Sequence, residues 1–257
     1  MTRPEVTVSL VSHGQGCLAG KLLVDLAQLD IAELIVTVNV PEDEAFLRSY
    51  PPERATVIRN ATPKGFGANH NTAFARCRTP WFVVINPDVR LPADPFASLL
   101  ATASALPGVG VVAPEIVDSA GRAEDSVRTN PTPLSVAGRL FDRKIGCIDE
   151  PRSLDSKAGF FWLAGMFLMF SSAAFRRVGG FDERYFLYYE DFDICARLQR
   201  AGFVIAVDRE VAAVHDAQRD SRRSLRHLKW HVGSLLRVWL TSAFWWVLLK
   251  CRPVGRG

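Results

Sequence analysis

The chain has 257 residues and a formal net charge of +4, and 48% of its residues are hydrophobic while 23% are charged. This composition is close to that of an average globular protein, which excludes a disordered chain and a fibrous repeat. Five scattered cysteines without a Cys-x-x-Cys pair indicate neither a disulfide framework nor a thiolate zinc site, so a reducing compartment fits best. The first residues lack the apolar run of an export signal, and we expect a cytoplasmic protein.

Strands and helices are predicted to alternate over the first 115 residues. The patterns indicate, in chain order, a strand at 6–11, a helix at 19–29, strands at 33–39 and 55–59, a helix at 66–76, a strand at 81–85, a helix at 96–105 and a strand at 109–113. Such alternation predicts an α/β fold with a mostly parallel central sheet flanked by helices. In such folds functional residues gather at the carboxyl ends of the strands.

The second half of the chain begins irregularly. Between 119 and 159 the periodicity fades, apart from a short helix at 134–141. Regular patterns then predict a strand at 166–170, a helix at 173–178, a helix at 191–201, strands at 203–207 and 211–215, and a final helical stretch at 223–250.

A glycine pattern follows the first predicted strand. Gly14, Gly16 and Ala19 match G-x-G-x-x-A, which places a pyrophosphate at a helix N-terminus in dinucleotide-binding proteins. Such a site also needs an acidic residue at the end of the second strand, where this chain has Asn39. A plain loop is therefore the favoured interpretation.

Asn86-Pro87-Asp88 follows the apolar strand at 81–85, so Asp88 should project from a sheet edge in a turn fixed by proline. A lone carboxylate there suits Mg²⁺ or Mn²⁺, because such ions take few protein carboxylates and complete their shell with water and substrate phosphates. The alternative is that Asp88 only caps the turn.

Three further places carry polar or aromatic side chains suited to a ligand. The glycine-rich turn at 63–71 offers Lys64, Gly65, Asn69 and Asn71, although alone it is merely a helix start. His215 ends a strand and is either a metal or phosphate ligand or a satisfied structural residue. Trp162 either stacks on a sugar or belongs to the core.

Residues 179–193 are the most informative segment, because four of its carboxylates lie among five of its aromatic rings. The carboxylates are Asp182, Glu190, Asp191 and Asp193, and the rings are Phe181, Tyr185, Phe186, Tyr188 and Tyr189. Some of these carboxylates would be desolvated unless a sugar hydroxyl, a cation or an arginine meets them, so the segment is interpreted as a catalytic wall. The helix dipole favours the Asp191 anion, whereas the rings would raise its pKa, and the sequence leaves the outcome open.

Together these motifs resemble the inverting family 2 glycosyltransferases with a GT-A fold, and most of all bacterial rhamnosyltransferases of O-antigen and related cell-surface polysaccharide assembly. The likeness runs from Val6 to Ser221 and includes Pro-Lys-Gly-Phe-Gly-Ala-Asn-His-Asn, Asn-Pro-Asp, Trp-x-x-Gly, Gly-Gly-Phe-Asp-Glu-x-Tyr-Phe-x-Tyr-x-Glu-Asp-Phe-Asp and a late histidine at a strand end. The most specific part of this likeness is residues 179–193, which we call the aromatic-acidic segment.

The resemblance implies roles for individual residues. Asp88 falls on the last acid of the metal-binding D-x-D motif, with Asn86 in place of the first acid, and His215 is a second candidate metal ligand. Asp191 falls on the catalytic base of the Glu-Asp motif, next to Glu190. The candidate donor-binding residues are Ser12, His13, Asn39, Lys64, Gly65, Asn69, Asn71, Asn86, Asp88 and Trp162.

Two departures from the family pattern affect donor recognition. The usual Asp-Asn after the second strand, whose acid contacts the nucleotide base, is replaced by Val38-Asn39. The first strand ends in Ser12-His13 where many relatives carry Tyr-Asn.

The resemblance implies a metal-dependent transfer, with Mg²⁺ or Mn²⁺ bound, from a nucleotide sugar to a polyprenyl-diphosphate-linked saccharide. The implied donor is dTDP-rhamnose, and no nucleic-acid partner is expected. A sugar-1-phosphate nucleotidyltransferase is an alternative, but it would need an arginine in the loop after the first strand, which has none. A non-catalytic sugar-binding protein at the membrane is another, and the intact Asp88 and Asp191 argue against it.

The last residues differ from the rest. We divide the chain into a glycosyltransferase domain at 1–221 and a basic, tryptophan-rich helical tail at 222–257. Its apolar run at 238–249 is shorter than the ~20 residues that a spanning helix needs. Tryptophans flanked by arginine and lysine are typical of a helix in the lipid headgroup layer, although a helix packed on the core is the alternative. We therefore expect a peripheral protein at the cytoplasmic face of the inner membrane.

Overall fold

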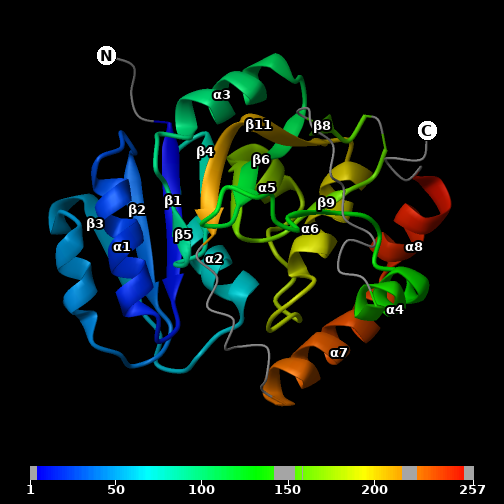
Figure 1. The fold of residues 1–257 in the computed structure, drawn as a ribbon, viewed down its shortest axis with the longest axis horizontal. Coiled ribbons are helices and arrows are strands. Elements are labelled where there is room, and N and C mark those ends of the chain that lie inside the picture. Colours follow the sequence, from blue (N-terminus) through cyan, green and yellow to red (C-terminus); the bar gives the residue numbers. More distant parts are fainter. Residues whose placement is uncertain (1–4, 142–153, 158, 216–224, 252–257) are drawn as a thin grey trace.

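The computed structural model describes residues 5–141, 154–157, 159–215 and 225–251 (Figure 1). In this part of the chain nine strands form one mixed sheet in the order β3-β2-β1-β4-β10-β6-β11-β5, with β8 beside β11. Its strands are β1 (Val6–Ser12), β2 (Glu33–Val38), β3 (Ala55–Arg59), β4 (Trp81–Ile85), β5 (Val89–Arg90), β6 (Val109–Val117), β8 (Leu154–Asp155), β10 (Phe167–Ser171) and β11 (Val204–His215). Two more strands, β7 (Val127–Arg128) and β9 (Trp162–Leu163), pair separately.

Helices cover both faces of the sheet. They are α1 (Gly16–Ala27), α2 (Phe66–Phe74), α3 (Phe96–Ala105), α4 (Pro133–Phe141), α5 (Ser172–Arg177), α6 (Glu190–Arg200), α7 (Leu225–Leu240) and α8 (Ser242–Lys250). Short 3-10 turns span Glu44–Ser49 and Pro52–Arg54. These bounds agree within a few residues with most of the elements expected from the sequence, because apolar periodicity reports burial directly.

The two faces have separate cores. Along β4, Phe82 and Val84 belong to one hydrophobic cluster while Val83 and Ile85 belong to the other, because successive side chains of a strand point to opposite faces. One cluster includes residues of α1 and α3. The other includes residues of α2, α5, α6, α7 and α8. The aromatic-acidic segment lies on this second face.

Strand direction was not evident from the sequence. The run β3-β2-β1-β4 is parallel, as expected, but β10 is antiparallel to both of its neighbours, β4 and β6. A period of two in the sequence identifies a strand but does not give its direction. The antiparallel strand β10 within the expected mostly parallel sheet was therefore not predicted. The strands predicted at 203–207 and 211–215 are one strand, β11, with an irregular register between Asp208 and Ala212.

The final helical stretch is two helices. The axes of α7 and α8 are bent by 63° at a break where Thr241 caps α8 by accepting a hydrogen bond from the Phe244 N–H at 3.2 Å. None of the described helices is by itself long and apolar enough to cross a bilayer, and this bent pair has the length and composition only when both members are counted together.

The helix pair is also part of the main core. Leu235 and Val238 of α7 and Phe244 and Val247 of α8 are buried in the same cluster as residues of α6. The start of the predicted stretch at 223, and the predicted boundary between 221 and 222, lie outside the described residues.

Two glycines test this packing. A Cβ on Gly67 would lie 2.5 Å from the Cβ of Phe181, whose ring is held by several other rings. We expect Gly67→Ala to lower the free energy of unfolding by about 1–3 kcal/mol, since overpacking forces neighbours to shift. Gly233 in α7 meets no described atom within 4 Å, so Gly233→Ala should stabilise by about 1 kcal/mol. Denaturant melts that move both variants in the same direction would contradict this packing.

Candidate active site

The catalytic candidate Asp191 lies in the first turn of α6, directly after an unusual backbone turn. Tyr188 and Tyr189 have φ angles of 73° and 68°. The left-handed region is uncommon for residues other than glycine and costs free energy, so such residues persist only where the surroundings hold them. Two in succession before Asp191 mark this turn as strongly constrained.

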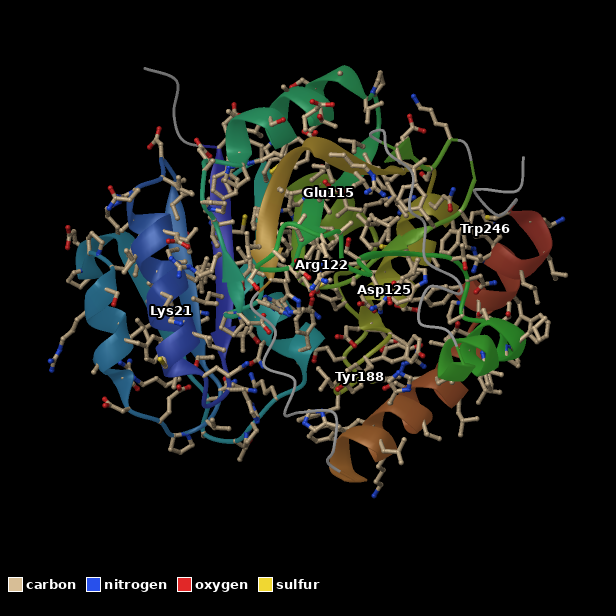
Figure 2. All side chains as sticks on the ribbon, in the orientation of Figure 1. Lys21, Glu115, Arg122, Asp125, Tyr188 and Trp246 are labelled. Carbon is tan, nitrogen blue, oxygen red and sulfur yellow. The ribbon has the colours of Figure 1, made fainter. Side chains whose placement is uncertain are left out.

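Helix α7 holds the turn. Ser234 donates its hydroxyl to the Leu187 carbonyl at 2.8 Å, and the Tyr188 hydroxyl lies 2.9 Å from Nδ1 of His227. The Tyr189 hydroxyl lies 3.4 Å from Nε2 of His231. Figure 2 shows Tyr188 beside α7. A helix expected to belong to the tail therefore holds the turn that precedes Asp191 in place.

The turn borders a cleft of about 220 Å³. Its lining includes the predicted site residues Asn86, Trp162, Glu190 and Asp191, together with Phe66, Tyr188, Tyr189, Arg128 and His231. The sequence did not single out the last two. Arg128 lies in the irregular region and carries no motif, and His231 lies in the predicted tail, so neither had a local signal.

Electrostatics at Asp191 are dominated by desolvation. Its Oδ2 accepts a hydrogen bond from the Gly165 N–H at 3.0 Å, and its Oδ1 accepts one from the Phe192 N–H at 2.9 Å. Burial raises the pKa of Asp191 above its ordinary 3.8, although the charge of Arg128 and these N–H groups act in the opposite direction. The sequence left open whether the helix dipole or desolvation controls the pKa of Asp191. In the structure, desolvation outweighs the opposing effects.

The neighbouring carboxylates have different partners. Asp193 accepts a hydrogen bond from Arg197 at 2.7 Å, and Asp182 pairs with Arg184, so arginines meet these two charges as the sequence allowed. Glu190 is buried, and its Oε2 has no hydrogen-bond partner among the described residues. Burial, followed by the charge of Asp191, raises the pKa of Glu190 well above 4.5.

Asp88 meets His215 because β5 pairs with the end of β11, where His215 lies opposite Val89. Nε2 of His215 lies 3.2 Å from Asp88 Oδ2, and Nδ1 lies 2.6 Å from Oε2 of Glu124. Burial alone would lower the pKa of His215, but the hydrogen bonds and charges of Asp88 and Glu124 outweigh it and raise the pKa to about 9. Glu124, in the irregular region, was not predicted.

Asp88 and His215 have two features that suit the binding of a divalent ion. Oδ1 of Asp88 is buried without a hydrogen-bond partner among the described residues. The carboxylate on the second nitrogen of His215 is the arrangement that orients metal-binding histidines. No three described His, Cys, Asp or Glu side chains are grouped to hold a metal ion by themselves. An ion bound here would depend on substrate oxygens and water, as Mg²⁺ usually does.

The turn at 86–88 is connected to Asp191 through one loop. The Asn86 N–H donates to the Met166 carbonyl at 2.9 Å, and the adjacent Gly165 N–H donates to Asp191. These two hydrogen bonds thus connect residues more than a hundred positions apart in the chain. Asn86 lines the cleft with Asp191, while the Asp88 side chain turns toward His215.

The indole of Trp162 belongs to the hydrophobic core and also lines the cleft. It is buried, its Nε1 donates to the Thr129 carbonyl at 2.7 Å, and the Arg128 guanidinium lies 5.1 Å from the ring centre. Its polar atom is therefore bonded within the protein.

Several predicted donor-binding side chains shape the surrounding loops. Asn39 accepts from the Lys64 N–H at 2.9 Å and donates to the Lys64 carbonyl at 3.0 Å, and Asn69 donates to the Gly65 carbonyl at 3.0 Å. A Cβ on Gly65 would lie 2.7 Å from the Phe186 carbonyl oxygen, so the glycine permits a close approach to the aromatic-acidic segment. These contacts fix the loop of Lys64 and Gly65.

Asn71 binds the aromatic-acidic segment directly. Its Nδ2 donates to the Phe181 carbonyl at 2.8 Å and to Glu183 at 3.0 Å, and its Oδ1 accepts from the Phe181 N–H at 2.9 Å. The side chain therefore tethers residues 110 positions away along the chain.

A carboxylate within the chain occupies the N-terminus of α1. Glu42 accepts hydrogen bonds from the Ser12 hydroxyl at 2.9 Å, the Gly14 N–H at 3.1 Å and the Gly16 N–H at 2.9 Å. Nearby, Asn39 donates to Nδ1 of His13 at 2.9 Å. Glu42 fills the place where the glycine pattern would hold a pyrophosphate, which supports the plain-loop interpretation. No sequence pattern marked Glu42.

Curated relatives share parts of the chain. An N-acetylglucosaminyl-diphospho-decaprenol L-rhamnosyltransferase of Mycobacterium tuberculosis is 34% identical over 159 residues, which cover 59% of this chain and 52% of that protein. The chain thus matches about half the length of that relative. Rhamnosyltransferase WbbL of Escherichia coli K12 is 28% identical over 243 residues, which cover 90% of this chain and 91% of the relative.

Solved structures confirm the predicted GT-A fold. A mannosyltransferase of Pyrobaculum calidifontis, in complex with GDP-Man and Mn²⁺, superposes with a TM-score of 0.60 at 20% identity, covering 92% of this chain and 65% of that one. GalNAc-T7 with UDP, GalNAc and Mn²⁺ gives a TM-score of 0.64 at 15% identity, covering 93% and 48%. The family model described as glycosyltransferase like family 2 matches residues 17–232. Because this match spans most of the chain, the protein belongs to the family 2 glycosyltransferases.

Proposed function

We propose that the protein transfers rhamnose from dTDP-rhamnose to a polyprenyl-diphosphate-linked saccharide in cell-surface polysaccharide synthesis, with inversion at the anomeric carbon. The names of the rhamnosyltransferase relatives support the sugar and the lipid-linked acceptor. The observation that carries the proposal is Asp191, whose partly buried carboxylate lines the cleft with Asn86 and aromatic rings.

Asp191 acts as the general base. The acceptor hydroxyl oxygen forms a bond to the anomeric carbon while the bond from that carbon to the diphosphate oxygen breaks. Asp191 takes the hydroxyl proton, and dTDP leaves with the bonding electron pair. One displacement inverts the configuration. The raised pKa of Asp191 makes it a stronger base than an ordinary aspartate, which suits proton transfer near neutral pH.

Asp88 and His215 would hold Mg²⁺ or Mn²⁺, and the bound ion supplies positive charge for the departing diphosphate. The spare buried oxygen of Asp88 and the Mn²⁺ in two structural relatives support this assignment. The loops shaped by Ser12, His13, Asn39, Lys64, Gly65, Asn69 and Asn71 border the nucleotide sugar in this proposal, with Trp162 in the cleft wall.

We place the reaction at the cytoplasmic face of the inner membrane. Helix α7 buries one face in the core and exposes a second apolar face at a spacing of four residues. This exposed face consists of Leu228, Val232, Leu236 and Leu240, and α8 adds Trp245, Leu248 and Leu249. Exposed aliphatic and indole groups on such a helix favour the headgroup layer, where a lipid-linked acceptor also lies.

Glu190 shares the cleft wall with Asp191. Burial and the charge of Asp191 both raise the pKa of Glu190, which disfavours a second negative charge beside Asp191.

Replacing Asp191 by Asn tests the base. We expect Asp191→Asn to lower kcat by at least about 10²–10⁴-fold, the contribution of a positioned base, while the affinity for dTDP stays within a few-fold. Glu210→Gln makes the same change of charge on an exposed side chain outside the cleft lining. This control should keep its turnover. Turnover retained in Asp191→Asn would remove Asp191 from the role.

Replacing Asp88 by Ala tests the metal. Titration calorimetry of dTDP with Mn²⁺ or with EDTA should show a metal-dependent gain in affinity that Asp88→Ala reduces by at least about tenfold, since even outer-shell partners of metals matter that much. The exposed Glu53→Ala serves as the charge control. An undiminished metal effect in Asp88→Ala would refute the assignment.

The buried Glu190 predicts a pH dependence of stability. The folded-state pKa of Glu190 lies above the ordinary 4.5. The favourable contribution of this group to folding stability is therefore fully present below pH 4.5 and is lost as the pH rises through the folded-state pKa. We expect Glu190→Gln to be the more stable protein at alkaline pH, with the difference shrinking as the solution is acidified. Thermal melts across pH measure this, and a difference that grows in acid would contradict it.

A further inference from the structure

A second hollow, of about 630 Å³, lies between α6 and the pair α7 and α8. Its charged lining comprises Arg184, Arg197, Arg200, Arg237, Asp182 and Asp193. Four arginines against two aspartates leave a net charge of +2 in this groove. The cleft of Asp191 has a different lining, so this groove has no part in the proposed chemistry.

Two of the arginines are paired with aspartates of the same chain. Arg197 donates to Asp193 and to the carbonyls of Val178 and Gly180 at 2.6 and 2.8 Å, and Arg184 pairs with Asp182. These contacts are structural.

The other two arginines carry the net charge. Arg200 donates to the hydroxyl of Ser242 at 3.0 Å, and the guanidinium of Arg237 lies 5.9 Å from the ring centre of Tyr185. Both side chains are exposed, and within the described ranges neither faces a carboxylate at ion-pair distance. Guanidinium groups favour phosphate because they can offer two parallel hydrogen bonds to it.

The same groove has an apolar rim. Leu236 and Leu240, which are 53% and 85% exposed, line it beside Arg237. They continue the exposed face of α7 that begins at Leu228. A partner that fits must therefore present an anionic phosphate next to hydrocarbon, and phospholipids of a membrane surface have this chemistry.

We propose that this groove binds the phosphate of an anionic membrane phospholipid, with Arg200 and Arg237 on the headgroup and with Leu236 and Leu240 against the acyl chains. The inference rests on the membrane placement within the proposed function and names the lipid class and the side chains responsible. It requires no turnover, so its test is a binding measurement.

The test is flotation of the full chain with vesicles of phosphatidylcholine alone or mixed with phosphatidylglycerol. The wild type should bind the mixed vesicles more tightly. Arg200→Gln combined with Arg237→Gln should weaken that binding by about 30-fold, the effect of two surface cations near anionic lipid. Leu236→Ser combined with Leu240→Ser should weaken binding to both kinds of vesicle.

The control removes two charges elsewhere. Arg48 and Arg76 are exposed and lie outside the groove lining, so Arg48→Gln combined with Arg76→Gln should bind as the wild type does. Equal loss in this control would show a general charge effect and overturn the site. Wild-type binding to both vesicles with equal affinity would also overturn it but would leave the membrane placement standing, whereas no binding to either would refute the placement itself. Thermal melts of each variant confirm folding, and transfer activity is measured separately.

Discussion

Three carboxylates in the first turn of one helix are the constraint around which the site is built. Asp193 is neutralised by Arg197, which also ties down two carbonyls of the preceding loop. Glu190 is buried with its pKa raised, and Asp191 keeps two N–H donors and an open side toward the cleft. Burying a charge without a partner is costly, and each of these three carboxylates avoids that cost in a different way. Asp191 combines a raised pKa with two backbone N–H donors that hold its orientation.

The same constraint explains the role of α7. The strained tyrosines that precede α6 would relax without the contacts from Ser234, His227 and His231. The face of α7 that meets the turn supplies those contacts, while Leu235 and Val238 anchor the helix in the main core. Removing the C-terminal helices would therefore damage the site itself, which is why point substitutions on their exposed faces are the sharper probe of membrane contact.

Local patterns in the sequence predicted much of this arrangement. Asp88 at a strand end, Asp191 at a helix start and most elements were identified because burial periodicity and turn chemistry act over a few residues. Glu42, Glu124, Arg128 and His231 were missed because their partners are distant in sequence and no local pattern marks them. The internal hydrogen bonds of Asn39 and Asn69 are likewise products of the folded loops.

Helix α7 places its exposed aliphatic face next to the cleft wall, because His231 lines the cleft and the following residue, Val232, belongs to the exposed face. Successive residues of an α-helix lie only about 100° apart around its axis. On the membrane arrangement proposed above, the cleft would therefore open within about one helix diameter, ~10–12 Å, of the headgroups. The first sugars of an acceptor whose lipid stays in the bilayer lie at that height.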